Sequence, residues 1–363
     1  MGDKSDESSI SGDFSRFLAD LSALRRKIGS SIGSYRKYDP QSSPIFHSWL
    51  AFAGPKSKAR QTPGGQPRPG RLSVALAIRK PAWLKVKIPQ GPQALAMSRL
   101  LRDRGLHTVC DEAACPNKAE CWGCGTATFM VLGDVCTRGC RFCAVATAKE
   151  GAIPNPDEPQ QLAAAIQELK LKYAVLTSVD RDDLSDRGAA HFAACIRAIR
   201  QANPTVEVEV LTADYRGAEL ATVLAAGPTV LAHNVETVRR LQGVRDARAS
   251  FDLSLQTLAE AHAAGFVTKS SLLLGLGETA DELLATMREL RTVGCDILVL
   301  GQYLQPSLKQ VPVLEYLSPQ RFDELAAMAR AEGFSAVVAS PLARTSYHAS
   351  AGWRASQAER QPG

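Results

Sequence analysis

Short apolar runs alternate with amphipathic stretches along the chain beyond residue 126. Runs of this length that are rich in Val, Leu and Ile predict buried strands. Six of them span residues 128–133, 173–178, 206–211, 229–234, 268–275 and 296–301. Because helical stretches separate them, we expect parallel βαβ units. A shorter run at 335–339 predicts one more strand, so the fold class is α/β, as an open or partial TIM-type barrel with six β/α units.

The stretches between these runs have the apolar spacing of helices that cover a sheet. Two of them place apolar residues at i, i+3, i+4 and i+7: Leu162, Ala165, Ile166 and Leu169, and Phe192, Cys195, Ile196 and Ile199. Thr279 and Glu282 form a capping-box pattern that begins a third helix. Ser318 with Pro319 begins a fourth. Parallel sheets place their sites at the carboxyl ends of the strands, so we expect the functional site there.

Length and composition limit the class of protein. A chain of 363 residues with 45% hydrophobic content can bury a full core. No apolar run approaches the roughly eighteen residues that a membrane span requires. The start MGDKSDE lacks the basic and then apolar layout of a secretory signal. We therefore expect a cytoplasmic protein with no membrane partner.

The first 80 residues differ from the rest in composition. They include GPKSKARQTPGGQPRPG, which cannot pack a core, so we expect residues 1–80 to be largely disordered. Residues 21–87 contain one acid, as an organellar transit peptide would, but the first twenty residues contain five, so an organellar matrix is the alternative location. Residues 1–90 carry a charge of +10 and the remainder −4. The nearly balanced body predicts no nucleic-acid partner.

The cysteines are strongly clustered. Seven of the nine fall between residues 110 and 143. In a chain with no secretory signal, such a cluster indicates metal binding or chemistry rather than disulfides. The other two, Cys195 and Cys295, occupy apolar positions and are expected to lie in the core.

Cys136, Cys140 and Cys143 place three soft ligands on the loop after the first predicted strand. Thiolates select zinc, copper(I) or iron–sulfur clusters. A structural zinc site needs a fourth protein ligand nearby, whereas a [4Fe–4S] cluster held by three cysteines leaves one iron open to a small molecule. The spacing therefore predicts an open cluster. A second triad, Cys110-x4-Cys115-x5-Cys121, fits no common zinc pattern.

With these residues, the sequence resembles the radical S-adenosylmethionine superfamily, which has the pattern C-x3-C-x-aromatic-C after the first strand of its barrel. Over roughly residues 80–350 it resembles the lipoyl synthase family, through the motifs VCDEAACPNKAECWG, GTATFMVLGDVCTRGCRFCAV, LTSVDRDDL, LGLGET, LGQYLQPS and PLARTSYHA. The resemblance implies an auxiliary-cluster segment at 81–126, a partial barrel at 127–335 and a serine-bearing C-terminal segment at 336–363.

The resemblance also implies roles for the two triads. The open iron of the first cluster would chelate S-adenosylmethionine, from which a 5′-deoxyadenosyl radical forms. Phe142 would lie near the adenine, or alternatively shield the cluster as a core side chain. The second triad would hold an auxiliary [4Fe–4S] cluster that donates sulfide and is dismantled. Its fourth ligand would be Ser346, in a motif whose first serine is Thr345 here.

Other candidate residues have alternative interpretations. Thr177, Ser178, Asp180 and Asn234 follow predicted strands and would contact S-adenosylmethionine or merely cap helices. Cys124 stands where the family commonly has glycine, and is a bystander thiol or a spare ligand. Single histidines are most often structural, so we assign none of them to metal. These histidines are His107, His233 and His348.

The resemblance implies the final step of lipoate biosynthesis. Two sulfur atoms would be inserted at C6 and C8 of an octanoyl group on a lysine of a lipoyl carrier domain. The carriers would be lipoyl domains of 2-oxoacid dehydrogenase complexes and the glycine cleavage carrier, and the reductant a low-potential donor such as ferredoxin or flavodoxin. The alternatives are another radical sulfur-inserting or methylthiolating enzyme, and a non-catalytic electron carrier with two clusters.

Overall fold

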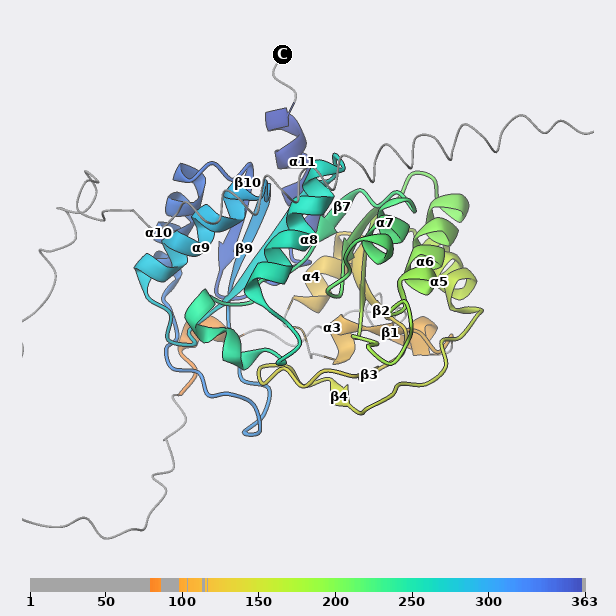
Figure 1. Cartoon of the computed structure of the whole chain (residues 1–363), viewed down its shortest axis with the longest axis horizontal. Helices are drawn as coiled ribbons and strands as arrows, with labels where there is room; N and C mark the ends of the chain where they lie inside the picture. Colours follow the sequence, from red (N-terminus) through yellow and green to blue (C-terminus); the bar gives the residue numbers. More distant parts are fainter. Residues whose placement is uncertain (1–78, 86–97, 103, 113–114, 116, 361–363) are drawn as a thin grey trace, which may run out of the picture. The chain divides into compact units, whose positions relative to one another are not determined.

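The computed structural model describes residues 79–85, 98–102, 104–112, 115 and 117–360 (Figure 1). The predictions for residues 1–78, including disorder and a transit peptide, lie outside this range. The described part is built on an eight-stranded sheet of order β1-β2-β5-β6-β7-β8-β9-β10. No pairing joins β1 to β10 within the described residues, so the sheet is an open barrel, as predicted.

The strand bounds agree with the predicted runs to within two residues, and the first of these strands starts and ends two residues before its run. The strands are β1 His107–Thr108, β2 Thr126–Val131, β5 Tyr173–Ser178, β6 Glu207–Leu211, β7 Val230–Ala232, β8 Val267–Leu274, β9 Ile297–Gln302 and β10 Ala336–Ser340. All neighbours are parallel except β1, which pairs antiparallel with β2. A separate parallel pair, β3 Val135–Cys136 and β4 Ala146–Thr147, follows β2.

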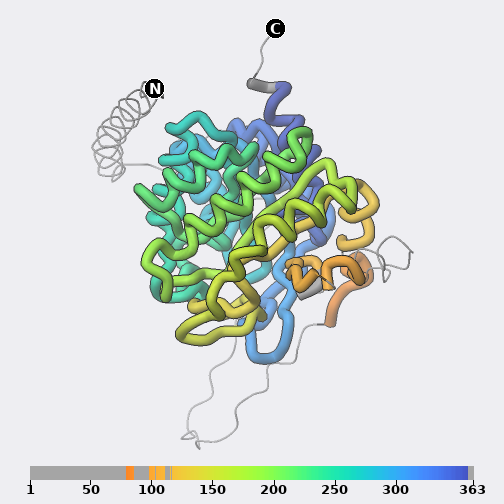
Figure 2. Tube along the Cα trace, turned by 90° about the vertical axis from the view of Figure 1, so that its right-hand side faces the viewer, coloured from red at the N-terminus to blue at the C-terminus, as the bar shows by residue number. Residues whose placement is uncertain are grey.

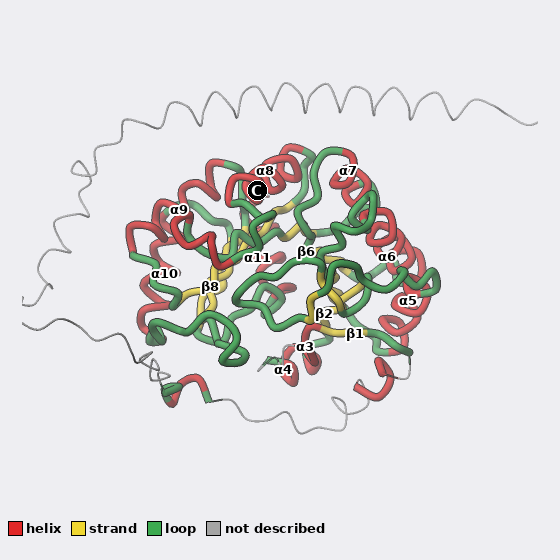
Figure 3. The backbone as a smooth tube through the Cα atoms, turned by 60° about the horizontal axis from the view of Figure 1, so that its bottom comes forward, coloured by secondary structure: helices red, strands yellow, loops and turns green. Residues whose placement is uncertain are grey.

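Helices α5 to α10 cover the outside of the sheet (Figures 1 and 3). The helices are α3 Val109–Glu112, α4 Lys118–Gly123, α5 Glu158–Glu168, α6 Ala189–Ala202, α7 Ala218–Leu224, α8 Phe251–Ala263, α9 Ala280–Thr292, α10 Pro319–Ala331 and α11 Ala349–Arg360, with short 3-10 helices η4 Ala82–Leu84 and η5 Arg239–Val244. The capping box at Thr279 is confirmed, because its side chain and that of Glu282 exchange hydrogen bonds with the backbone. Ser318 caps α10.

The core lies between the sheet and these helices. Leu162, Phe192 and Ile196, from the predicted apolar faces of α5 and α6, are fully buried against the first half of the sheet. Met287 and Phe322, from α9 and α10, are buried against the second half. The predicted core positions of Cys195 and Cys295 are confirmed, since both thiols are inaccessible.

The first strand ends two residues earlier than its apolar run suggested. Leu132 and Gly133 have positive φ angles of 68° and 92°, which turn the chain out of the sheet. Side chains hold this turn: the Leu132 N–H donates to Glu158 at 3.2 Å, and Arg181 donates to the Leu132 carbonyl at 3.2 Å. A left-handed backbone at a branched residue is costly, so these contacts fix where the next loop begins.

The C-terminal segment returns to the beginning of the barrel. Trp353 of α11 packs on Tyr173 with ring centroids 6.5 Å apart, and contacts the cluster of Val230, Val267 and Ile297 at the strand starts. Residues before α11 lie beside α4, although more than 200 positions separate them (Figure 2). Asn117 donates to the Leu342 carbonyl at 2.6 Å. The fold thereby brings residues 341–348 next to the second cysteine triad.

A buried ion pair lies inside the barrel. The Lys269 ammonium donates to both Glu209 oxygens at 2.8 and 3.1 Å, and the Tyr173 hydroxyl donates to Glu209 at 2.9 Å. All three side chains are almost completely buried. Removing one member of such a pair leaves an uncompensated charge in the interior.

We expect Lys269→Met to lower the free energy of unfolding by about 3–5 kcal/mol, because Glu209 would lose its counter-charge. Urea denaturation followed by circular dichroism measures this change. The double variant Lys269→Met/Glu209→Leu should recover most of the loss. A single variant as stable as the original chain would contradict the assignment.

Candidate functional site

The first cysteine loop lies at the carboxyl edge of the sheet. Cys136 ends β3, its carbonyl accepts from Ala148 N–H at 3.1 Å, and Cys143 N–H donates to the Cys140 carbonyl at 3.0 Å. Distant segments hold the loop from outside: Arg141 N–H donates to the Val244 carbonyl at 2.7 Å, and its own carbonyl accepts from residue 311 at 3.0 Å. The site is where the order of parallel strands predicted it.

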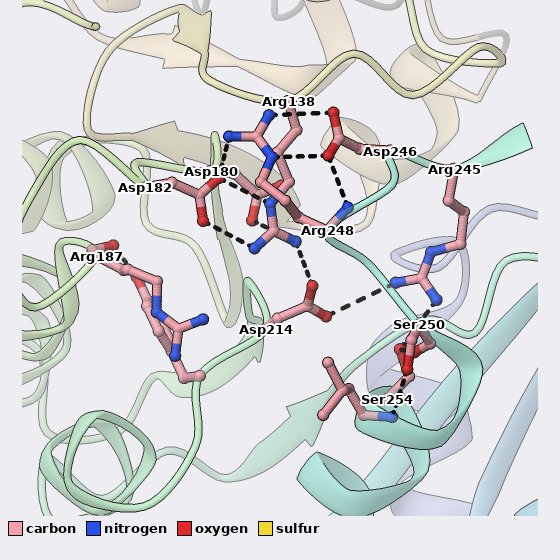
Figure 4. Close-up of polar contacts among 12 residues, drawn as sticks. Arg138, Asp180, Asp182, Arg187, Asp214, Arg245, Asp246, Arg248, Ser250 and Ser254 are labelled. Carbon is pink, nitrogen blue, oxygen red and sulfur yellow. Dashed lines mark hydrogen bonds and ion pairs between the residues drawn. The ribbon is translucent and has the colours of Figure 1, made fainter. Parts of the chain in front are cut away.

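The buried guanidinium of Arg138 anchors this loop to the sheet (Figure 4). It donates to both Asp182 oxygens at 2.9 Å and lies 3.4 Å from Asp180. It also makes a short contact with Asp214, which follows β6. A buried arginine is stable only when paired and hydrogen-bonded, so three carboxylates at the ends of β5 and β6 determine the position of the loop. The hydrogen bonds from Arg138 hold the pKa of Asp182 below its usual range.

A second set of charged residues, in the segment after η5, contacts the same loop (Figure 4). Asp246 accepts from Gly139 N–H at 2.8 Å, and its own N–H points at the Cys140 sulfur at 3.3 Å. Arg248 holds Asp246 at 2.8 Å, lies 3.2 Å from Asp182 and keeps the pKa of Asp246 well below its usual range. The two networks therefore share a carboxylate.

The thiols of the first triad are arranged for binding rather than for free nucleophilic chemistry. Burial raises the pKa of Cys136 and Cys143, and raises that of Cys140 to about 12. Backbone N–H groups point at two of the sulfurs, from Arg138 to Cys136 at 3.4 Å and from residue 246 to Cys140. N–H···S hydrogen bonds of this kind tune iron–sulfur centres. Metal binding at such thiols must displace protons.

The residues predicted at the end of β5 lie beside this loop. The Asp180 carboxylate is 3.9 Å from the Cys136 sulfur, and burial raises its pKa while Arg138 opposes the shift. Thr177 is buried, and the Ser178 hydroxyl is buried without a hydrogen-bond acceptor or donor among the described residues. Phe142 packs against the apolar cluster of Leu276, Tyr303 and Val313. Whether these side chains contact S-adenosylmethionine stays a prediction.

Asn234 and Glu236 follow β7 on the same edge. The Asn234 amide donates to the Thr345 hydroxyl at 3.0 Å. Glu236 has a positive φ of 67°, and burial raises its pKa. Burial is the main cause of the raised pKa of Cys140 and Cys143, and the negative charge of Glu236 raises both further. The Glu236 carboxylate therefore lies beside the first triad. Glu236 is missing from the predicted site residues. Like Asn234, it is a polar residue just past the end of β7, and this position in the sequence could have identified it.

The second triad forms at the junction of β1, α3 and α4. Cys110 is on α3, Cys121 is on α4 and Cys115 lies between them. Burial raises the pKa of Cys110, and raises that of Cys121 to about 12, with the neighbouring thiols adding to both shifts. The buried indole N–H of Trp122 faces Cys110 and opposes the upward shift in the pKa of that thiol.

The C-terminal segment closes over this triad. The Tyr347 hydroxyl donates to Glu120 of α4 at 3.1 Å. Arg344 lies beside Cys115: burial lowers the pKa of the guanidinium and the thiol opposes the shift. Ser346 therefore lies between Arg344, which is beside Cys115, and Tyr347, which contacts the helix that carries Cys121. Its ligation of iron stays a prediction.

The structure allows a test of whether the triads fit a cluster. Among the described residues, one group of three ligand atoms lies within 4.8 Å of one another, and it contains neither triad. Tetrahedral zinc, with bonds of about 2.3 Å, would bring its sulfurs to roughly 3.8 Å. Both triads are wider than this. The residues therefore fit a group larger than a single zinc ion.

The group that does lie within 4.8 Å is Glu158, His191 and Cys195. His191 Nε2 contacts Glu158 at 2.6 Å, which is a hydrogen bond. The same Glu158 oxygen accepts from Leu132 N–H. We therefore assign the group to holding the turn before the cysteine loop. The His233 ring contacts the Thr212 carbonyl and a serine of α8 at 3.0 and 3.1 Å, and its structural role stays a prediction.

Comparisons with known proteins agree with this geometry. Residues 130–290 match the radical SAM superfamily, and residues 17–115 match the N-terminal domain of lipoyl synthase of the radical SAM family. The lipoyl synthase of Methylococcus capsulatus is 51% identical over 307 residues, covering 81% of this chain and 95% of that protein. That of Thermus thermophilus is 52% identical, covering 74% and 85%. The chain belongs to the lipoyl synthase family.

More distant likenesses are also found. The chloroplastic lipoyl synthase of Arabidopsis thaliana is 45% identical, covering 85% of this chain and 80% of that protein. Among solved structures, a methylornithine synthase is 14% identical with a TM-score of 0.46, covering 69% and 82%.

Family membership confirms several predictions. The fold class is confirmed, and the chain is a sulfur-inserting enzyme of the radical SAM type with S-adenosylmethionine and [4Fe–4S] clusters as cofactors. The alternative of a non-catalytic electron carrier is therefore not supported. In the described part of the chain, no helix has the length and apolarity needed to cross a bilayer.

We expect Arg181→Lys to slow cleavage of S-adenosylmethionine by about tenfold or more, because the turn that positions Cys136 loses its guanidinium contact. The guanidinium also binds Asp183 at 2.9 Å, a fork that lysine cannot reproduce. Release of 5′-deoxyadenosine measures the effect. Arg240→Lys, at an exposed ion pair with Glu282, is the matched control and should leave the rate unchanged. Equal rates in both variants would refute the role of the turn.

Proposed function

We propose that this chain inserts two sulfur atoms at C6 and C8 of an octanoyl group on a lysine of a lipoyl carrier domain. The observation that carries the proposal is the position of residues 344–347. Thr345 contacts Asn234 at the edge that holds the first triad, while Tyr347 contacts Glu120 beside the second. One short segment therefore spans the space between two thiol sites, and that space is where an acyl chain would meet both.

The two sites have different tasks in this proposal. When bound, the first cluster with S-adenosylmethionine supplies a carbon radical that can take hydrogen from an unactivated C–H bond, and the second cluster supplies sulfide. Cys136, Cys140 and Cys143 would hold the first group, and Cys110, Cys115, Cys121 and Ser346 the second. Neither acid–base chemistry nor a thiolate nucleophile breaks such C–H bonds.

The surrounding residues orient the reactants and exclude water. Arg138 and its carboxylates fix the first loop, whose three cysteines would hold the first cluster beside the strand ends. Thr177, Ser178, Asp180, Asn234 and Glu236 supply polar groups at that edge for the amino acid and nucleoside parts of S-adenosylmethionine. Phe142, packed in its apolar cluster, covers the outer side.

Ser346 differs in kind from the other predicted ligands. Iron–sulfur sites favour thiolates, so a hard alkoxide oxygen is a weak partner for iron. A weak fourth ligand suits a cluster that must lose an iron when it gives up sulfur. The role of Ser346 in the proposal is thus to complete the second site while allowing it to open.

The proposal extends to the partners. The substrate would be an octanoylated lipoyl domain, with lipoyl domains of 2-oxoacid dehydrogenase complexes and the glycine cleavage carrier as the particular carriers. A low-potential donor such as ferredoxin or flavodoxin would supply the electrons. An enzyme that methylthiolates RNA is less well supported, since the body of the chain has a nearly balanced charge.

Removing each triad separates the two tasks. The variant Cys110→Ala/Cys115→Ala/Cys121→Ala should bind about four irons instead of about eight, and should still cleave S-adenosylmethionine. It should form no lipoyl product from an octanoyl-lysine peptide. The variant Cys136→Ala/Cys140→Ala/Cys143→Ala should also retain about four irons but cleave nothing. Loss of cleavage in the first variant would contradict the division of tasks.

Substitution of Ser346 tests the weak-ligand argument. Ser346→Cys should bind its second cluster more firmly but lose most product formation, since a thiolate resists loss of iron. Iron retention under a chelator and mass spectrometry of the peptide product measure the two effects. Full turnover by Ser346→Cys would count against this role.

A further inference from the structure

A cleft of about 290 Å³ lies beside the second triad, where strands β2 and β5 begin. The side chains that line it include Cys121 and Cys124, Glu120 and His348, and the cations Lys172 and Arg354. Cys121 belongs to the second triad and also borders this cleft. It therefore connects the buried thiol site to solvent.

Cys124 is the exposed thiol of the cleft. It ends α4, where its N–H donates to the Glu120 carbonyl at 3.0 Å. Burial raises the pKa of Cys121, and the negative charge of the Cys124 thiolate adds to this shift. The two thiols are thus neighbours on one helix end, one exposed and one half-buried.

His348 lies at the rim of the cleft. It has a positive φ of 51°, a backbone conformation that histidine adopts more often than most other residues. Its ring stacks near Tyr347 with centroids 4.0 Å apart, and Nε2 lies 3.3 Å from Glu120. These contacts hold the imidazole beside the Glu120 carboxylate in the cleft.

The charges indicate what the cleft would admit. Neither Lys172 nor Arg354 has a carboxylate partner within the described ranges, and both face the same space as the thiols. Two unpaired cations attract an anion and repel a bare divalent metal ion. Iron that carries thiolate or sulfide ligands is anionic and soft, which matches both the cations and Cys124.

We propose that this cleft is the entry port through which iron and sulfide refill the second site, with Cys124 as the first protein ligand. The inference rests on the proposed function, because a cluster that gives up its sulfur must be rebuilt before the next turnover. Entry is ligand exchange: Cys124 gives its proton to the departing thiolate as its sulfur binds iron. Cys121 then displaces Cys124 in the same way. No electron changes hands in these exchanges. Where the cluster is instead assembled from ferric iron and sulfide, two thiolates are oxidised to a disulfide and supply the two electrons that four ferric ions need.

Refilling kinetics test the port. The background is the variant Cys136→Ala/Cys140→Ala/Cys143→Ala, in which the second site alone can be loaded. The apo form is offered a preformed [4Fe–4S] cluster with four 2-mercaptoethanol thiolates in one arm, and ferric iron with sulfide and excess dithiothreitol, which is the reductant, in the other. Visible absorbance of the bound cluster follows loading. In this background, Cys124→Ser should slow loading by about tenfold in at least one arm while the final iron content stays the same, because a hydroxyl is a poor ligand for soft iron.

The two arms identify the source. Slowing in the first arm alone points to delivery of an intact anionic cluster, and Arg354→Glu should then slow that arm as well. Slowing in both arms points to capture of iron in either form. Cys295→Ala, at a buried thiol that lies in neither triad and does not line the cleft, is the matched control and should load at the unmodified rate.

Two outcomes have separate meanings. Equal loading rates with and without Cys124 in both arms would overturn the port and leave the proposed function intact. Failure of the background variant to load any cluster would instead overturn the second site itself. Unchanged far-ultraviolet circular dichroism in Cys124→Ser excludes misfolding as the cause of slow loading.

Discussion

The arrangement of the site depends on one buried cation. Arg138 belongs to the cysteine loop, and its carboxylate partners come from the ends of two different strands. Removing Arg138 would leave the charge of its carboxylate partners uncompensated in the interior. The loop therefore cannot move without separating the guanidinium from β5 and β6. This is how three thiols on an otherwise irregular segment acquire a fixed position above a parallel sheet.

The second triad obtains its position in a different way. Its cysteines lie on two short helices and the chain between them, which the C-terminal segment covers by contacts to Asn117 and Glu120. A site assembled from both ends of the described chain is easier to open than one fixed by strand ends. That difference corresponds to the tasks proposed for the two clusters: the first is retained between turnovers, and the second is consumed and rebuilt.

Sequence reasoning predicted the regular parts of this molecule well. The apolar runs located the parallel strands, and the cysteine spacings located both thiol sites, because these signals are local. It could not predict the left-handed turn at Leu132, whose partners Glu158 and Arg181 are 26 and 49 positions away. Strand β1 has two residues and no usable period. Glu236 was missed because its approach to the first triad follows from the fold.

The account requires that the inserted sulfur comes from the second cluster of the same chain. Protein loaded with heavy-isotope sulfide, freed of excess sulfide and given an octanoyl-lysine peptide in a single anaerobic turnover, tests this most directly. Mass spectrometry of the product should find two heavy sulfur atoms in each lipoyl group. Product that contains only light sulfur, from a source in solution, would contradict the account.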